Sequence, residues 1–197
     1  MKKPFIIAVA GPVGAGKTTF SGILAKRLGA KHYAADEPFF YFVKHDPIAT
    51  EQITGVPVGD MTSTEYLTKH LLKDTDTLYR YTVAAWEYVK QVFATELAKY
   101  PIVIVDFWAI DKEFYESADL RILIKSSDDE ARLLKYQIRE SESKRNTPAQ
   151  CVLVTECAAK LVNALWGLQD ILIINSYDGL DLFEQEAERI AKALQRH

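Results

Sequence analysis

Short, mainly apolar runs alternate along the chain with longer stretches whose apolar residues recur at helical spacing. The runs cover residues 4–10, 102–105, 120–124 and 171–174. Such runs are typical of parallel strands that are buried on both faces. Strands that alternate with helices indicate an α/β fold with a mostly parallel central sheet.

Helices are predicted after most of these runs. One begins at Lys17, where the apolar positions change to helical spacing. Ser127 with Glu130 has the sequence of a capping box and predicts a helix through about Glu142. A closing amphipathic helix is predicted over 182–194.

The middle of the chain is less regular. Residues 32–42 predict a second strand that runs into a loop. Residues 43–61 contain two prolines and two glycines, which predict an irregular segment. Helices are predicted to fill most of 63–98, with a break near 74–76.

Composition narrows the class of protein. The 197 residues are 48% hydrophobic and 26% charged, which is ordinary for a globular chain with its own core. The net charge of −3 lacks the basic excess of a nucleic-acid binder, and the first apolar run is too short to cross a bilayer. Cys151 and Cys157 are expected to be buried small hydrophobes. We expect a cytoplasmic protein without nucleic-acid or membrane partners.

A phosphate-binding sequence lies between the first strand and the first helix. Residues 11–18 match G-x-x-x-x-G-K-[ST]. The glycines let backbone N–H groups turn toward phosphate oxygens, Lys17 places a positive charge on the β- and γ-phosphates, and the Thr18 hydroxyl can ligate Mg²⁺. The predicted nucleotide-binding residues are Gly11, Pro12, Val13, Gly14, Ala15, Gly16, Lys17, Thr18 and Thr19.

Asp106 directly follows the apolar run 102–105. An aspartate at the carboxyl end of a parallel strand beside a P-loop can hold Mg²⁺ directly or through water. We therefore predict a metal site formed by Thr18 and Asp106.

Other P-loop classes fit the sequence less well. A GTPase carries an N/T-K-x-D signature on a late strand, whereas the run 171–174 is followed by Asn-Ser-Tyr-Asp. Motor and chaperone-type ATPases are longer and carry further domains. A small phosphotransferase remains.

The order of elements resembles the small-molecule P-loop kinases, above all the uridine kinase and phosphoribulokinase family. The resemblance covers residues 4–42 and 101–175. Residues 36–41, Asp-Glu-Pro-Phe-Phe-Tyr, are similar to the aspartate and Phe-Tyr of uridine kinases, and residues 169–175 are similar to their Ala-Asp-Ile-Ile-Ile-Pro-Asn segment.

The deoxynucleoside kinase family is the second resemblance. Its members place Glu-Pro after the second strand, as Glu37-Pro38 does here, and their P-loop is similar to residues 11–20. They also carry Glu/Asp-Arg-Ser after the third strand, where this chain has Asp106-Phe107-Trp108 and lacks the arginine.

These resemblances imply a P-loop NTPase three-layer sandwich with a short helical lid. They imply one domain over 1–197, an acceptor-site helical insertion at about 43–98 and a lid at about 132–150. The implied enzyme uses ATP and Mg²⁺ to phosphorylate a hydroxyl of a nucleoside or similar small molecule. Homo-oligomerisation is left open.

The catalytic base implied by the resemblance is one of two adjacent acids. The uridine kinase alignment selects Asp36, and the deoxynucleoside kinase alignment selects Glu37. Neighbouring residues of an extended segment point to opposite faces, so we expect only one of them to face the γ-phosphate.

The lid is expected to supply positive charge to the transferred phosphoryl group. Arg132, Lys135 and Arg139 share one face of the predicted helix, and Lys144 and Arg145 follow. Arg139 and Arg145 match the lid arginines of these families and, with Lys17, are the predicted charge-stabilising residues. A solvated helix face paired with nearby acids is the structural alternative for Arg132 and Lys135.

Two other functions fit the same sequence. One is a kinase of another metabolite. The other is a non-catalytic, nucleotide-binding regulatory protein that kept its P-loop and lost the acceptor site.

Overall fold

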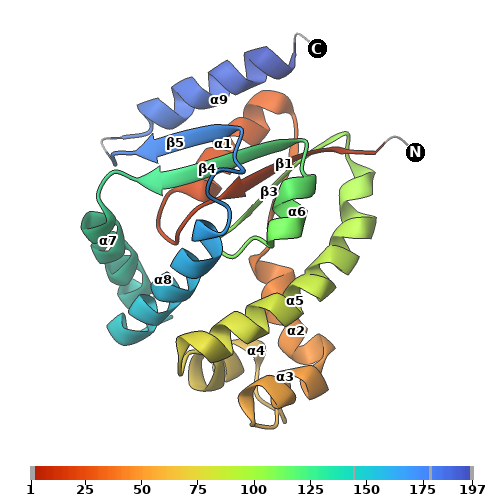
Figure 1. Cartoon of the computed structure of the whole chain (residues 1–197), viewed down its shortest axis with the longest axis vertical. Coiled ribbons are helices and arrows are strands. Elements are labelled where there is room, and N and C mark those ends of the chain that lie inside the picture. Colours follow the sequence, from red (N-terminus) through yellow and green to blue (C-terminus); the bar gives the residue numbers. More distant parts are fainter. Residues whose placement is uncertain (1–2, 144, 178, 196–197) are drawn as a thin grey trace.

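A five-stranded parallel sheet forms the centre of the molecule. The computed structural model describes residues 3–143, 145–177 and 179–195. The strands are β1 (Phe5–Ala10), β2 (Lys31–Ala34), β3 (Ile102–Phe107), β4 (Leu120–Ser126) and β5 (Ile171–Asn175). Their order in the sheet is β2-β3-β1-β4-β5, and each neighbouring pair is parallel (Figure 1). The predicted α/β fold with a parallel sheet is confirmed.

Helices cover both faces of this sheet. In β1, Ile7 and Val9 point to one face, where they pack in a cluster with α1 (Lys17–Leu28) and α9 (Asp181–Leu194). Ala8 and Ala10 point to the other face and join the larger apolar cluster. Burial on both faces explains why the strand sequences are apolar without alternation.

The second face is covered mainly by α5 (Thr75–Glu96), which runs diagonally below and to the right of the strands in Figure 1 and continues into a short 3₁₀ turn, η2 (Leu97–Lys99). Helices α2 (Asp36–His45), α6 (Lys112–Ser117) and α8 (Pro148–Asn163) complete this layer. These elements and the opposite helix pair give a three-layer α/β fold.

The interpretation of residues 36–54 as loop and irregular segment was wrong, whereas residues 55–61 are irregular as predicted. Residues 36–45 form α2, because Phe39, Phe42 and Val43 recur at helical spacing and are buried. A further helix, α3 (Pro47–Thr54), begins where Asp46 accepts a hydrogen bond from the backbone N–H of Ala49. Proline in the first turn starts this helix instead of preventing it.

The predicted helices of 63–98 are confirmed, with their break. Helix α4 (Ser63–Tyr66) runs into a π-helical turn, η1 (Leu67–Leu71), and the chain turns before α5. Asp74 caps α5 by accepting a hydrogen bond from the Thr77 backbone N–H.

Two predicted boundaries shift in the structure. Helix α7 (Asp129–Glu142) is capped by Asp128, which accepts from the Ala131 backbone N–H, and the predicted capping box at Ser127 is wrong. Asp106 lies inside β3 and does not follow it, because pairing with β1 continues to Phe107.

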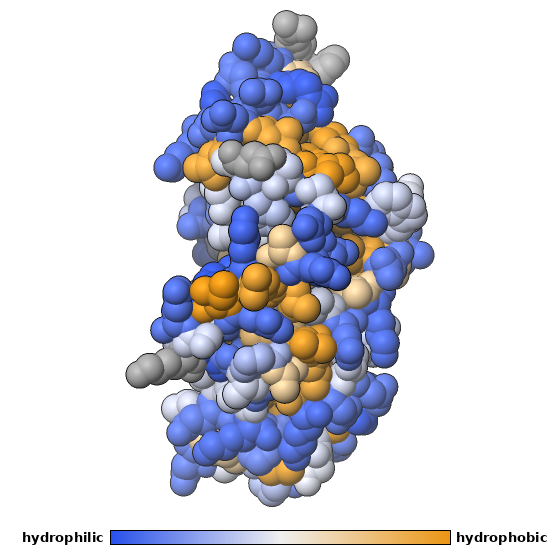
Figure 2. Space-filling model, turned by 90° about the vertical axis from the view of Figure 1, so that its left-hand side faces the viewer, coloured by the Kyte–Doolittle hydropathy of each residue, from blue (hydrophilic) through white to orange (hydrophobic). Residues whose placement is uncertain are grey.

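The surface beside α7 is mainly hydrophilic, with apolar patches across its middle (Figure 2). Leu134 and Ile138 of α7 are among the exposed apolar residues of the chain. No helix in the described ranges is long and apolar enough to cross a membrane.

The packing of α5 on the sheet predicts a large stability effect at Trp86. This side chain is 2% exposed, packs against Phe107 and Phe114, and donates its indole N–H to the Ala109 carbonyl. We expect Trp86→Ala to lower the free energy of unfolding by about 3–5 kcal/mol, because it leaves a cavity and an unpaired carbonyl. Chemical denaturation would measure this loss.

Trp166→Ala is the matched control, since Trp166 is 54% exposed. Its ring lies 3.7 Å from the Lys125 ammonium group, and we expect its removal to cost about 1 kcal/mol or less. Equal losses from the two substitutions would contradict this account of the core.

Candidate functional site

A cavity of about 470 Å³ opens at the carboxyl ends of the strands. This edge is where open parallel sheets bind ligands. The cavity is lined by the P-loop, by α7 and by the segment after β5. Its lining includes Lys17, Thr18, Thr19, Asp36, Asp106, Trp108, Lys135, Arg139, Asn175 and Tyr177.

The P-loop connects β1 to α1 and requires glycine at two close approaches. Gly11 has φ of 154°, and a Cβ there would lie 2.3 Å from the carbonyl oxygen of Ile124 in β4. Gly16 has φ of 94°, and a Cβ there would lie 2.7 Å from the ring of Phe183 in α9. Both backbone angles favour glycine, so the loop fits between β4 and α9 only with these residues.

Lys17 lies at the first position of α1 and is 8% exposed. Its ammonium group donates a hydrogen bond of 2.9 Å to the carbonyl of Pro12. Burial lowers the pKa of Lys17 to about 8, although the negative charges of Asp106 and Asp36 oppose this shift. Thr18 and Thr19 follow with exposed side chains on the cavity.

Asp106 is 1% exposed, and one of its two carboxylate oxygens has no hydrogen-bond partner in the described residues. Its Oδ1 lies 3.2 Å from Nε2 of His32, and its Oδ2 is buried without a hydrogen-bond partner in the described residues. Such an unpaired carboxylate oxygen fits a hard cation. The described ranges contain no cluster of three or more metal-binding side chains. Asp106 and the Thr18 hydroxyl would therefore supply a partial shell, as Mg²⁺ bound to phosphates and water requires.

The two adjacent acids, Asp36 and Glu37, lie in different environments. Asp36 is half-buried and lines the cavity with Lys17 and Asp106. Glu37 is exposed and does not line that cavity. Both residues lie in the first turn of α2, so helical geometry and not strand alternation points them in different directions.

The charge environment of Asp36 also differs from that of a surface acid. Burial raises its pKa, and the nearby Asp106 carboxylate raises it further. Lys17, Arg139 and Arg145 oppose this shift.

A shallow groove adjoins the cavity at Asp36. Its lining continues with Glu37, Phe40, Tyr41 and Ser63. The rings of Phe40 and Tyr41 are 44% and 54% exposed, so their surfaces are open to a ligand.

The basic residues of α7 occupy three different environments. Arg132 is 5% exposed and donates to the carbonyl of Val13 at 2.7 Å, while its Nε pairs with Asp129 at 2.9 Å. Lys135 lines the cavity and lies 4.3 Å from the ring centroid of Tyr177. Arg139 lines the cavity and pairs with Glu140 at 3.0 Å.

The predicted residues beyond α7 lie elsewhere. Arg145 is exposed and is not part of the cavity lining. Lys144 lies outside the described residues.

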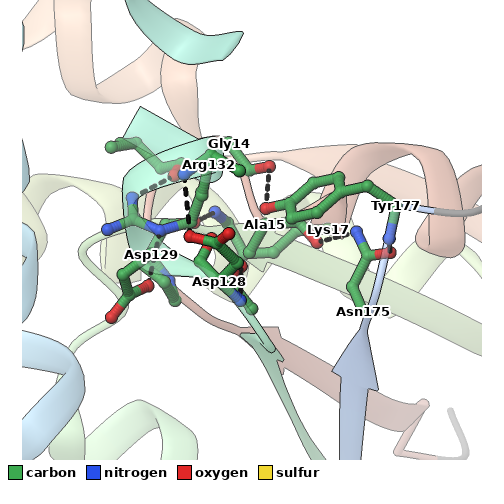
Figure 3. A network of polar contacts seen from close by, with 12 residues as sticks. Gly14, Ala15, Lys17, Asp128, Asp129, Arg132, Asn175 and Tyr177 are labelled. Atoms are coloured by element: carbon green, nitrogen blue, oxygen red, sulfur yellow. Dashed lines mark hydrogen bonds and ion pairs between the residues drawn. The ribbon is translucent and has the colours of Figure 1, made fainter. Parts of the chain in front are cut away.

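Three further residues of the site, Trp108, Asn175 and Tyr177, are not among the predicted site residues. Asn175 donates from Nδ2 to the Ala15 carbonyl at 3.0 Å, and the hydroxyl of Tyr177 donates to the Gly14 carbonyl at 3.0 Å (Figure 3). Trp108 lines the cavity from the end of β3. Asn175 does fall in the segment 169–175 that resembles uridine kinases, which is the one signal that could have found it.

Comparisons with known proteins agree on the fold. No model of a protein family and no curated protein matches the sequence. The fold is similar to protein TT1252 from Thermus thermophilus, with a TM-score of 0.71, 17% identity, and coverage of 98% of this chain and 99% of that chain. It is also similar to shikimate kinase from Acinetobacter baumannii in complex with shikimate, with a TM-score of 0.55, 16% identity, and coverage of 98% and 94%.

Shikimate kinase from Bacteroides thetaiotaomicron gives a third similarity, with a TM-score of 0.53, 14% identity, and coverage of 96% and 98%. At these identities the similarity establishes only the three-layer α/β fold, which this chain shares with these solved structures. It does not single out the uridine kinases.

Proposed function

We propose that this protein is an ATP- and Mg²⁺-dependent kinase that phosphorylates a hydroxyl group of a small molecule. The observation that carries the proposal is the convergence of Lys17, Asp36 and Asp106 on one cavity at the P-loop. A phosphate-binding cation, a half-buried carboxylate and a metal-binding carboxylate are the groups that phosphoryl transfer requires. The similarity of the fold to P-loop kinases supports the same conclusion.

Each group has a part in the reaction. Asp36 would accept the proton of the acceptor hydroxyl, and its raised pKa makes it a better base than an ordinary surface carboxylate. Lys17 would bind the phosphate oxygens, and Lys135 and Arg139 would stabilise the charge of the transferred group. Mg²⁺, held by Thr18 and Asp106, would neutralise charge on the β- and γ-phosphates.

The groove beside Asp36 indicates the kind of acceptor. Its exposed rings, Phe40 and Tyr41, offer stacking surfaces, and its further polar groups are Glu37 and Ser63. An uncharged ring that carries hydroxyl groups fits this lining, because an anion would meet the Asp36 and Glu37 carboxylates. A nucleoside or a similar molecule has these properties.

The acid pair provides the first test of the reaction. A panel of nucleosides and other hydroxyl compounds would be screened for ADP release to find an acceptor. With that acceptor, we expect Asp36→Asn to lower kcat by about 10²–10⁴-fold, the usual contribution of a general base, with little change in ATP affinity.

Glu37→Gln is the matched comparison. We expect it to change the KM for the acceptor, because Glu37 lines the groove, while kcat stays within about threefold of the wild-type value because Glu37 lies outside the P-loop cavity. The reverse result would transfer the role of base to Glu37. ATP binding without transfer to any acceptor would instead favour a nucleotide-binding regulatory protein.

The lowered pKa of Lys17 predicts a pH dependence of nucleotide binding. Phosphate favours the charged ammonium form, so ATP binding raises the pKa of Lys17 from its value of about 8. Affinity should therefore fall as pH rises through this value, and binding should take up protons there. One pH unit above it, affinity for Mg-ATP should be about tenfold weaker than at neutral pH.

Calorimetry in buffers of different ionisation enthalpy would measure both the affinity and the proton uptake. Lys17→Met should bind more weakly and lose the dependence in this window, with its fold retained by circular dichroism. A wild-type affinity that does not change across the window would contradict the lowered pKa of Lys17, and equal affinities of wild type and Lys17→Met would rule out Lys17 as the phosphate ligand.

A further inference from the structure

Three successive carbonyl groups of the P-loop are held by side chains from distant parts of the chain. Arg132 donates to Val13 at 2.7 Å, Tyr177 to Gly14 at 3.0 Å and Asn175 to Ala15 at 3.0 Å (Figure 3). Arg132 comes from α7, and the other two come from the end of β5 and the segment that follows it.

The planarity of the peptide bond gives these contacts a consequence for the amide groups. In a trans peptide unit, the C=O of one residue and the N–H of the next point in opposite directions. Fixing the Val13 and Ala15 carbonyls therefore fixes the Gly14 and Gly16 N–H groups on the opposite side of the loop. Neither of these N–H groups donates a hydrogen bond within the described residues. The Ala15 N–H instead donates to Pro12 at 3.2 Å and closes the turn.

The backbone at Tyr177 is unfavourable for its residue type. Its φ is 64°, the one positive φ of a non-glycine residue in the part of the chain that the structure describes. Glycine would adopt this angle without strain. Tyrosine adds two contacts that glycine lacks, its hydroxyl on the Gly14 carbonyl and its ring against the Lys135 ammonium group at 4.3 Å. A strained residue with such contacts points to a functional constraint.

The two other donors are also buried more than their polarity favours. Arg132 is 5% exposed and Asn175 is 6% exposed. Burial of polar groups costs free energy unless they are hydrogen-bonded, and the loop carbonyls supply part of that bonding. The oxygen of Asn175 in turn accepts from the Tyr177 backbone N–H at 3.0 Å, which joins the two residues into one unit.

We propose that Arg132, Asn175 and Tyr177 are positioning residues that form a carbonyl clamp on the P-loop. Arg132 and Asn175 preset the Gly14 and Gly16 amides for phosphate before the nucleotide binds, and Tyr177 holds the Gly14–Ala15 peptide that lies between them, so that binding does not have to order the loop. This inference rests on the nucleotide site of the proposed function and adds that α7 and the segment after β5 control its affinity.

Tyr177→Phe tests the clamp because it keeps the ring and removes only the hydroxyl. The probes are Mg-ATP and Mg-tripolyphosphate, and the second has no base or ribose that could contact Tyr177. We expect the affinity for both to fall by the same factor, about three- to tenfold for one lost hydrogen bond.

Tyr115→Phe is the matched control. Tyr115 is fully buried, and its hydroxyl has no hydrogen-bond partner in the described residues. We expect this control to leave both affinities within about twofold of wild type. A similar loss in the two variants would show a general effect of core disturbance and would overturn the clamp.

Amide hydrogen exchange of the ligand-free protein separates positioning from direct ligand contact. Residues 11–18 should exchange faster in Tyr177→Phe than in wild type, because one of the bonds that order the loop is missing. A hydroxyl that served only as a ligand contact would leave exchange in the free protein unchanged, and that result would overturn the clamp.

Arg132→Met is the second variant, since methionine keeps an apolar stem in place of the guanidinium group. We expect about tenfold or greater loss of affinity for tripolyphosphate, because a charged donor is removed. Binding by Arg132→Met and Tyr177→Phe at wild-type strength would overturn the proposal. These binding measurements need no acceptor. Absence of phosphoryl transfer by a wild-type protein that binds ATP would count against the kinase proposal alone.

Discussion

The buried positive charge of Lys17 is the constraint on which the arrangement of the site depends. An ammonium group removed from water costs free energy unless hydrogen bonds and opposite charges surround it. The Pro12 carbonyl accepts a hydrogen bond from the Lys17 ammonium group, and Asp106 and Asp36 stabilise its charged form. Its pKa is nevertheless lowered to about 8. The compensation is therefore incomplete, and in the proposed function the phosphates of the nucleotide would supply the missing negative charge.

The sheet brings these charges together through strand order and register. Strands β1 and β3 are neighbours, and Val9 of β1 pairs with Asp106 of β3 near the start of the P-loop. On the other side of β3, Ala34 of β2 also pairs with Asp106, so Asp36 begins α2 at the same edge. Parallel strands in this order place three charged side chains at one edge of the sheet, although these residues are far apart in sequence: Lys17, Asp36 and Asp106.

Local patterns made part of this structure predictable. The P-loop is one continuous segment whose function is set by residue types at fixed spacing, and the strands are recognisable because both faces are buried. Helix α2 was missed because its aromatic residues favour a strand by propensity, whereas burial of Phe39 and Phe42 on the sheet selects a helix. Tertiary packing overrides local preference there.

The contacts that hold the P-loop could not be predicted in the same way. Each joins residues 119 to 163 positions apart, and no motif links a donor to its carbonyl. The sequence grouped Arg132 with Lys135 and Arg139 because helical spacing puts them on one face. Spacing does not report depth, and Arg132 is buried against the loop while the other two face the cavity.

This difference in depth divides α7 into two functional parts. Arg132 fixes the first turn of the helix to the Val13 carbonyl. Lys135 and Arg139 extend from the next turns, and Arg139 pairs with the neighbouring Glu140 and lies over the ring of Tyr136 at 5.3 Å. Movement of basic residues toward a bound phosphate must therefore come from the later turns, because movement of the first turn would break the contact that orders the P-loop. In the proposed function, the same helix would hold the phosphate site rigid and still change the charge around it.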